Sequence, residues 1–275
     1  MPIDENTTSP DELPRSAAWL IAASAVIVIV LFMFVDPVAQ DPAYHEFVDA
    51  RRLFAIPNFW NVASNLPFLF IGMYGFLIVR RYPLLVRESG LHRAWQVFFI
   101  GVFLTSFGSG YYHLAPANAT LVWDRLPMTI AFSGLFTLVI GEYLSVRAAR
   151  HLLMPLLLAG AASVIYWGAT EASGAGDLRP YAVVQFLPMI LTCAILVMYR
   201  RASDLTRYLW LMIAMYTIAK LLEFFDAGIY GILGFVSGHS LKHVAASLGP
   251  LALLFALHTR ARVAHEDHAD EETGL

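Results

Sequence analysis

Eight long apolar runs constrain this chain more than any other feature of its sequence. Each run is about as long as the roughly 20 apolar residues that an α-helix needs to cross the hydrocarbon core of a bilayer. None shows the strict alternation of apolar and polar residues that is typical of barrel strands. The runs are Ala17–Val35, Trp60–Val79, Leu91–His113, Leu126–Val146, Leu152–Thr170, Tyr181–Tyr199, Tyr208–Phe225 and His239–His258.

Composition points to the same surroundings. Hydrophobic residues make up 58% of the 275 residues and charged residues 14%, whereas soluble domains are roughly half apolar and a quarter charged. We therefore expect an all-α, polytopic transmembrane helical bundle. The net charge of -3 gives no reason to expect a nucleic acid partner. The single cysteine, Cys193, lies inside an apolar run, so no internal disulfide is expected.

The first apolar run is interpreted as a retained helix and not as a signal peptide. The segment before it contains one basic residue, Arg15, and four acidic residues, Asp4, Glu5, Asp11 and Glu12. A signal peptide has a basic leader and a shorter apolar core than this run. We expect residues 1–16 to form a polar cytoplasmic tail and residues 17–35 to form an N-terminal transmembrane helix.

Arginines predict the orientation of the bundle. Alternate connections are rich in arginine, whereas those on the opposite side contain only Arg51, Arg52, Arg125 and Arg179. By the positive-inside rule both termini are cytoplasmic. Residues 36–57 then form an extracytoplasmic loop, and residues 263–275 form an acidic cytoplasmic tail. The arginines assigned to the cytoplasmic side are Arg80, Arg81, Arg87, Arg93, Arg147, Arg150, Arg200, Arg201, Arg207, Arg260 and Arg262.

Three histidines at the ends of predicted spans form a candidate metal site. His113 ends the third run, while His239 and His243 open the last one and share a helix face because they are four residues apart. The predicted orientation places all three in the extracytoplasmic half. Catalytic zinc takes three protein ligands and keeps a fourth position open, so we predict that these histidines bind Zn²⁺. A simple hydrogen bond between helices is the alternative.

Ser109 and Asp124 are the candidate catalytic residues. Ser109 lies one helical turn before His113, and Asp124 follows His113 by eleven residues on a helix that runs back to the same depth. A hydroxyl and a carboxylate beside a metal suit a hydrogen-bond donor and a base. Ser109 as a small packing residue remains an alternative. Asp124 could also be a helix N-cap, with Pro127 in the first turn.

Two further groups of polar residues lie in the spans. Asn58, Asn61 and Asn65 open the second run at helical spacing, and hydrogen bonding between helices is the favoured interpretation. Tyr181 and Gln185 share a face of the sixth helix, where they can line a cavity.

Four charged residues near the seventh and eighth runs also need an explanation, because charges inside a bilayer are costly. Lys220 and Glu223 have the spacing of a neutralising pair. Lys242 can pair with Glu223 or with Asp226. We interpret all four as structural charge compensation.

Taken together, these residues resemble the alkaline ceramidase family, which belongs to a superfamily that includes adiponectin-type receptors. The resemblance covers residues 58–262 and rests on four motifs in order along the chain: Asn61-x-x-Ser64-Asn65, Ser109-x-x-x-His113, Asp124 and His239-x-x-x-His243. It implies a seven-helix domain that encloses zinc bound by His113, His239 and His243. The family's serine and aspartate correspond to Ser109 and Asp124.

Two features depart from that family. The run Ala17–Val35 adds one transmembrane helix before the seven-helix core. Eukaryotic ceramidases also carry a carboxylate-rich calcium site just before their first core helix, and Asn58 stands here instead of an acid. This difference argues against calcium, although Glu46 and Asp49 lie upstream.

The function expected from the resemblance is that of a zinc-dependent amidohydrolase in sphingolipid metabolism. It would cleave the linear amide C–N bond of a ceramide-like membrane lipid into a free fatty acid and an amine. Ester hydrolysis on the same metal is a second enzymatic possibility. The rival from another class is a receptor or scaffold with structural zinc and no turnover, for which four protein ligands are typical. A transporter has less support, because no pair of broken helices in matching halves of the chain is evident. No protein partner is expected.

Overall fold

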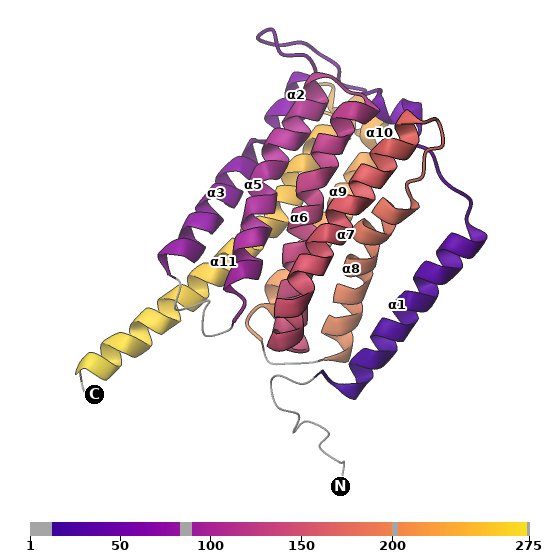
Figure 1. The fold of residues 1–275 in the computed structure, drawn as a ribbon. Coiled ribbons are helices and arrows are strands. Elements are labelled where there is room, and N and C mark those ends of the chain that lie inside the picture. The colour runs from indigo at the N-terminus through magenta and orange to yellow at the C-terminus, as the bar shows by residue number, and fades with distance from the viewer. Residues whose placement is uncertain (1–12, 83–89, 200–202, 274–275) are drawn as a thin grey trace.

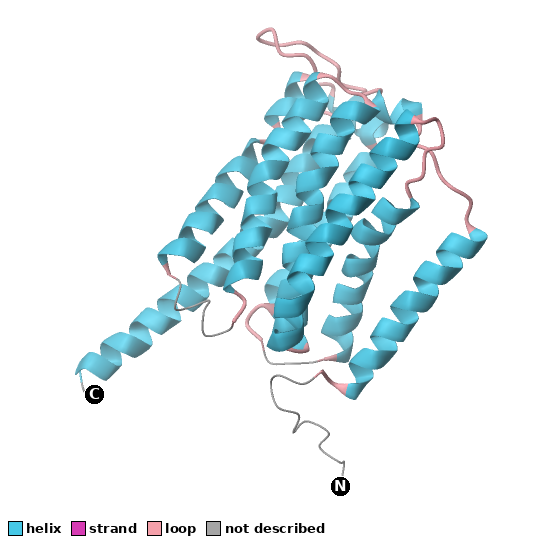
Figure 2. Cartoon of the chain, viewed as in Figure 1, coloured by secondary structure: helices cyan, strands magenta, loops and turns pink. Residues whose placement is uncertain are grey.

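The computed structural model describes residues 13–82, 90–199 and 203–273, and these residues contain helices and no β-strand. Figure 2 shows long helices joined by loops at the two ends of the molecule. The predicted all-α class is confirmed. The predicted tail of residues 1–16 lies mostly outside the described residues, as do Arg87, Arg200 and Arg201.

Successive long helices run through the bundle in opposite directions (Figure 1). Their bounds are α1 Arg15–Phe34, the short 3-10 helix η1 Pro42–His45, α2 Phe59–Ala63, α3 Leu66–Arg81, α5 His92–Leu114, α6 Asn118–Tyr143, α7 Val146–Ala172, α8 Arg179–Met198, α9 Thr206–Phe224, α10 Asp226–Leu233 and α11 Gly238–Thr273.

Seven passages in the described residues are long and apolar enough to cross a membrane on their own: α1, the α2–α3 pair, α5, α6, α7, α8 and the first part of α11. Helix α9 meets the same test only together with α10, to which it is joined by a bend of 77°. The eight predicted apolar runs thus correspond to seven straight passages and one bent pair. The protein is a multi-pass helical bundle of the membrane type.

Helix α6 occupies the middle of the bundle, where it packs against α5, α7 and α8, while α11 packs against α9 and α3. Glycines permit the closest approach: Gly101 of α5 lies directly against the backbone of Ala131 in α6. Small residues at such contacts allow helix backbones to come together in a bilayer. By contrast, α1 stands apart beside α8, and most of its side chains are exposed (Figure 1).

The second apolar run is broken into α2 and α3 at Ser64 and Asn65. Pro67 lies in the first turn of α3, where proline is tolerated because its missing N–H would have no helical partner. The break turns Ser64 toward α11, which matters for the site below.

Helix boundaries correct two sequence expectations. Helix α6 begins at Asn118, eight residues before the predicted start of that run, so Asp124 lies in the second turn and the N-cap interpretation is wrong. Helix α11 continues to Thr273, so the segment expected to form a polar tail from residue 263 is helical as far as that residue.

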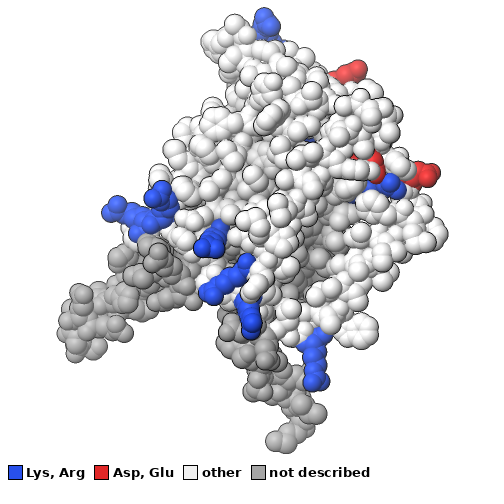
Figure 3. Space-filling view, in the orientation of Figure 1, with Lys and Arg blue, Asp and Glu red and all other residues white. Residues whose placement is uncertain are grey.

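Basic side chains gather at one end of the molecule. Helix α1 begins and α11 finishes at the lower end in Figure 1, and lysines and arginines are concentrated there in Figure 3. At the opposite, upper end, the loop that follows α1 crosses the bundle. Arg179 ties this loop down by donating to the carbonyl of Val35 at 2.6 Å. The same guanidinium, paired with Asp177 at 2.8 Å, holds the pKa of that carboxyl below its usual value.

Candidate metal centre

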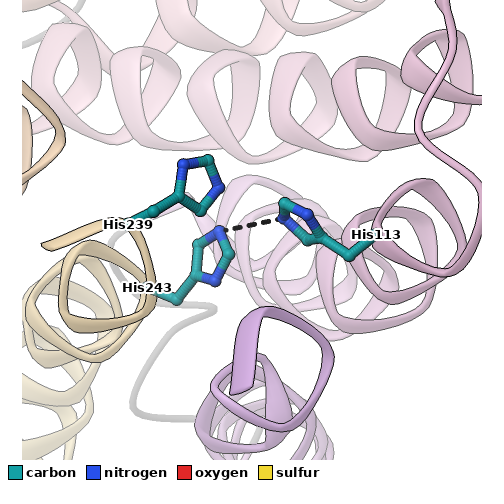
Figure 4. Close-up of side chains that lie close together, drawn as sticks. All are labelled: His113, His239 and His243. Atoms are coloured by element: carbon teal, nitrogen blue, oxygen red, sulfur yellow. Dashed lines mark hydrogen bonds between the residues drawn. The ribbon is translucent and has the colours of Figure 1, made fainter. Parts of the chain in front are cut away.

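His113, His239 and His243 meet inside the upper end of the bundle. His113 lies in the last turn of α5, and the other two lie in the first turns of α11. All three are buried, and their ring centroids are 4.9–5.1 Å apart. Figure 4 shows the three rings pointing toward one another. The predicted convergence of these side chains is confirmed.

The donor set fits a metal ion. One ring nitrogen from each histidine lies within 4.8 Å of the others, and the Nε2 atoms of His113 and His243 are 3.4 Å apart. Tetrahedral zinc, with Zn–N bonds of about 2.0–2.1 Å, places its nitrogen ligands roughly 3.4 Å from one another. Nε2 of His239 is buried without a hydrogen-bond partner among the described residues. Buried polar atoms are rarely left so, and metal coordination accounts for such an atom.

His243 is oriented by the α2–α3 break. Its Nδ1 shares a hydrogen bond of 2.8 Å with the hydroxyl of Ser64, and that hydroxyl also donates to the carbonyl of Asn61. Ser64 then accepts from Nδ1–H of His243, which leaves Nε2 of the ring free of a proton and available to a metal. A hydrogen bond to the ring nitrogen that does not bind the metal fixes the orientation of a metal-binding histidine.

The asparagines of α2 and α3 connect helices, as the sequence interpretation favoured. Asn61 accepts a hydrogen bond of 2.7 Å from Ser240 of α11. Asn58 donates to the carbonyl of His113 at 2.8 Å. Asn65 donates to the carbonyl of Asn61 within its own segment. These contacts lock the start of α2 against the two helices that carry the histidines.

Phe47 covers the histidines from the loop between α1 and α2. Its ring lies 4.8 Å from that of His113 and 4.7 Å from that of His239, measured between centroids. The neighbouring His45 joins Tyr112 of α5 at 2.9 Å and Asn118 of α6 at 2.8 Å. These loop residues could not be identified from the sequence, because nothing in a loop's composition shows where it crosses the bundle.

Ser109 and Asp124 line one cavity with the histidines. The cavity has a volume of about 370 Å³, and Tyr181 and Gln185 also line it, as predicted. Ser109 is buried one turn before His113, and its hydroxyl interacts with the carboxylate of Asp124. No carboxylate or cysteine in the described part of the chain joins the histidine cluster. The three imidazoles therefore leave one side of the cluster open to a cavity that contains a carboxylate and a hydroxyl.

Glu223 compensates two lysines beside this cavity. Lys220 pairs with it at 2.8 Å, and Lys242 contacts its other oxygen. The predicted Lys220–Glu223 pair is confirmed. Asp226, the alternative partner of Lys242, instead accepts a hydrogen bond of 2.7 Å from the backbone N–H of His239. Asp226 thereby anchors the first turn of α11, which carries two of the histidines.

Arg125 differs from its predicted position in an extracytoplasmic loop. It lies in the second turn of α6, is only 6% exposed and lines the cavity. The loop assignment of Arg125 and the N-cap interpretation of Asp124 were wrong for the same reason. Helix α6 starts eight residues before the apolar run that predicted it. An arginine directly beside a candidate catalytic carboxylate was the signal available in the sequence.

Asp49 lies in the loop between α1 and α2, upstream of Asn58. Its two carboxylate oxygens each accept a hydrogen bond of 2.7 Å from the guanidinium of Arg51. Arg51 also donates to the carbonyl of Phe235 just before α11, and the backbone carbonyl of Asp49 accepts from Asn61. An arginine thus serves as the cationic partner of Asp49 in this loop.

Neither a model of a known protein family nor the sequence of a curated protein matches this chain. The chemistry of the site is therefore inferred from its residues: three histidines that can hold a metal ion, with a carboxylate, a hydroxyl and an enclosed space beside them.

Proposed function

We propose that this protein is a membrane-embedded, zinc-dependent amidohydrolase that cleaves the amide bond of a ceramide-like lipid, as the resemblance to alkaline ceramidases implies. One observation carries the proposal. The buried histidine cluster opens into a cavity that also contains Asp124 and Ser109. A structural zinc site is closed by four protein ligands, and no fourth candidate ligand joins the cluster among the described residues.

Zinc bound by His113, His239 and His243 supplies a Lewis acid that polarises a carbonyl group and lowers the pKa of water to about 7. Asp124 accepts a proton from the water that attacks the amide carbon, and it returns a proton to the departing amine nitrogen. Ser109 donates a hydrogen bond to the oxygen that becomes negatively charged. The C–N bond breaks, and the products are a fatty acid and an amine.

The shape of the interior suits the acyl chain of a lipid. A second, apolar cavity of about 130 Å³ shares five lining residues with the first: Phe68, Thr105, Met128, Tyr216 and Ala246. Its remaining lining is entirely hydrophobic and comes from α5, α6, α8, α9 and α11: Phe98, Val102, Ala131, Phe132, Leu135, Met189, Met212 and Pro250. The first part of an acyl chain can lie here while its amide group faces the histidines, since a cavity of about 150 Å³ accommodates a molecule the size of benzene.

The proposal includes a location in the cell. The arginine-rich lower end of the bundle faces the cytoplasm with both termini, and the histidine cluster lies in the extracytoplasmic half.

Hydrolysis of a lipid panel by the purified protein tests the function. The panel contains N-palmitoylsphingosine, N-palmitoylethanolamine and palmitoyl esters of matched length, with and without a zinc chelator. We expect amide hydrolysis that the chelator abolishes and added zinc restores. A zinc-loaded protein that releases no fatty acid would support the receptor or scaffold alternative, and cleavage of the esters alone would assign a different bond.

Asp124→Asn separates catalysis from metal binding in the same assay. The variant retains zinc but loses roughly 10²–10⁴-fold in kcat, the usual contribution of a general acid–base group. Asp36→Asn is the matched control, because Asp36 is exposed in the loop after α1. Full activity of the Asp124 variant would remove this carboxylate from the mechanism.

A further inference from the structure

Arg125 is a buried cation that has no ion-pair partner in the described part of the chain. It is 6% exposed, and none of the ion pairs in the described residues includes its guanidinium. Placing a charge in a low-dielectric interior costs several kcal/mol unless a counter-charge or hydrogen bonds compensate it. An arginine in this position therefore needs a functional explanation.

Two aromatic rings and one amide hold the guanidinium in place. Its central carbon lies 4.0 Å from the ring centroid of Trp167 and 4.7 Å from that of Tyr181. One terminal nitrogen donates to Gln40 at 2.6 Å. The other, Nη1, is buried without a hydrogen-bond partner among the described residues, and the residue lines the cavity that contains the histidines. The planar guanidinium of Arg125 is thus fixed by these contacts, and its Nη1 remains available as a hydrogen-bond donor.

The cavity as a whole has an excess of positive charge. Arg125, Lys220 and Lys242 line it, against the carboxylates of Asp124 and Glu223. Glu223 is already shared by both lysines, and a bound metal ion would add further positive charge. An enclosed site lined mainly by one sign of charge attracts ligands of the other sign.

Helix α6 shows which half of a lipid amide would meet this charge. Met128, Ala131 and Leu135 follow Arg125 along the helix and line the apolar cavity. With a rise of 1.5 Å per residue, Leu135 lies about 15 Å deeper than Arg125. An acyl chain in the apolar cavity therefore leaves the amine half of the molecule at the level of Arg125.

We propose that Arg125 binds an anionic group on the amine half of the substrate. The preferred lipid amides then carry a carboxylate, sulfonate or phosphate there, as N-acyl amino acids do. This inference depends on the proposed function, because it assumes that a lipid amide occupies the cavity.

Two lipid amides that differ in one terminal group test the proposal on the wild-type protein. N-palmitoylglycine and N-palmitoylethanolamine have the same acyl chain, and they end in a carboxylate and a hydroxyl respectively. Binding to the purified protein is measured by calorimetry, with palmitate as a third ligand. We expect N-palmitoylglycine to bind at least about 10-fold more tightly than the neutral amide, as for hydrogen bonds to charged groups. Equal affinities would overturn the proposal without any variant being needed.

Variants assign the preference to Arg125. Arg125→Gln should weaken binding of N-palmitoylglycine by roughly 10- to 100-fold and change that of N-palmitoylethanolamine by less than about threefold. Arg125→Lys retains the charge but loses the planar stack, so an intermediate loss is expected. Arg207→Gln, on an exposed arginine at the lower end, is the control and should behave as wild type. If Arg125→Gln weakens palmitate as much as N-palmitoylglycine, the anion belongs to the acyl half and the proposal is wrong.

These experiments distinguish a failure of the proposed anion subsite from a failure of the proposed hydrolase function. Charge-selective binding without cleavage would contradict the proposed hydrolase and leave the anion subsite intact. Cleavage of both amides with no dependence on Arg125 would contradict the subsite and leave the hydrolase intact.

Discussion

The three histidines of the candidate metal centre differ in which neighbouring residues hold them in place. His243 is oriented by Ser64 at 2.8 Å, whereas Nδ1 of His113 has no protein partner and is buried. The backbone of His239 is anchored by Asp226 at 2.7 Å. The site therefore relies on packing, notably the ring of Phe47 against two of the imidazoles, as well as on hydrogen bonds.

Removing one imidazole should empty the metal site. We expect His113→Ala and His239→Ala each to lose bound zinc, because two ligands from one cluster do not provide the three that such a site requires. Elemental analysis of the purified variants measures the metal content. His258→Ala is the control, since this ring stacks on Tyr74 farther along α11. A His113 variant with one zinc per chain would contradict the assignment.

Ser64 should act as a positioning residue. Ser64→Ala removes the hydrogen bond to His243, so we expect zinc affinity to fall by roughly 10- to 100-fold. Competition with a chelator measures this affinity. Ser64→Thr retains a hydroxyl and should restore it. Ser106→Ala is the matched control, because Ser106 bonds only the carbonyl of Phe103 in its own helix. An unchanged zinc affinity of Ser64→Ala would show that the hydrogen bond has no role in metal binding.

At the level of helices, the site depends on how closely α5 approaches α6. His113 and Ser109 lie on α5, while Asp124 and Arg125 lie on α6. Glycine contacts between these helices set their separation, because Gly101 lies against the backbone of Ala131. A small shift of either helix would move the candidate base relative to the metal.

Gly101→Ala should therefore destabilise the bundle. The added methyl group would collide with the backbone of Ala131, and overpacking of this kind costs about 1–3 kcal/mol. Gly110→Ala in the same helix meets no atom within 4 Å, so it should be neutral or stabilise the protein by about 0.5–1 kcal/mol. Thermal unfolding in detergent compares the two. Equal melting temperatures for both variants would refute the close-packing explanation.

At the level of the whole molecule, both the distribution of basic side chains and the fold distinguish one end of the bundle from the other. The ends of the described chain lie together with most of the visible basic side chains (Figures 1 and 3), and the histidine cluster lies at the other end. This distribution is what the positive-inside rule requires of a protein whose lower end is cytoplasmic.

Labelling in intact cells tests that orientation. Phe54 is 85% exposed in the loop between α1 and α2, so Phe54→Cys in a Cys193→Ser background should react with an impermeant maleimide added outside. A fluorescent protein fused to the C-terminus should remain shielded from external protease. Labelling of Phe54→Cys only after the cells are lysed would invert the proposed topology.

The sequence by itself determined the number and order of the apolar passages and the depth of the histidines. These properties are local: they depend on run length, on four-residue spacing and on which connections carry arginine. Spacing and predicted depth also grouped His113, His239 and His243 with Ser109 and Asp124, and the structure confirms that they line one cavity.

Only the tertiary structure decided what surrounds the histidines. Phe47 and Gln40 come from a loop without periodicity, and their contacts with α5, α6 and α11 join residues far apart in the chain. Arg125 was assigned to a loop because α6 starts eight residues before the apolar run that predicted it. Long-range packing, which no local pattern encodes, placed this arginine in the cavity between two aromatic rings.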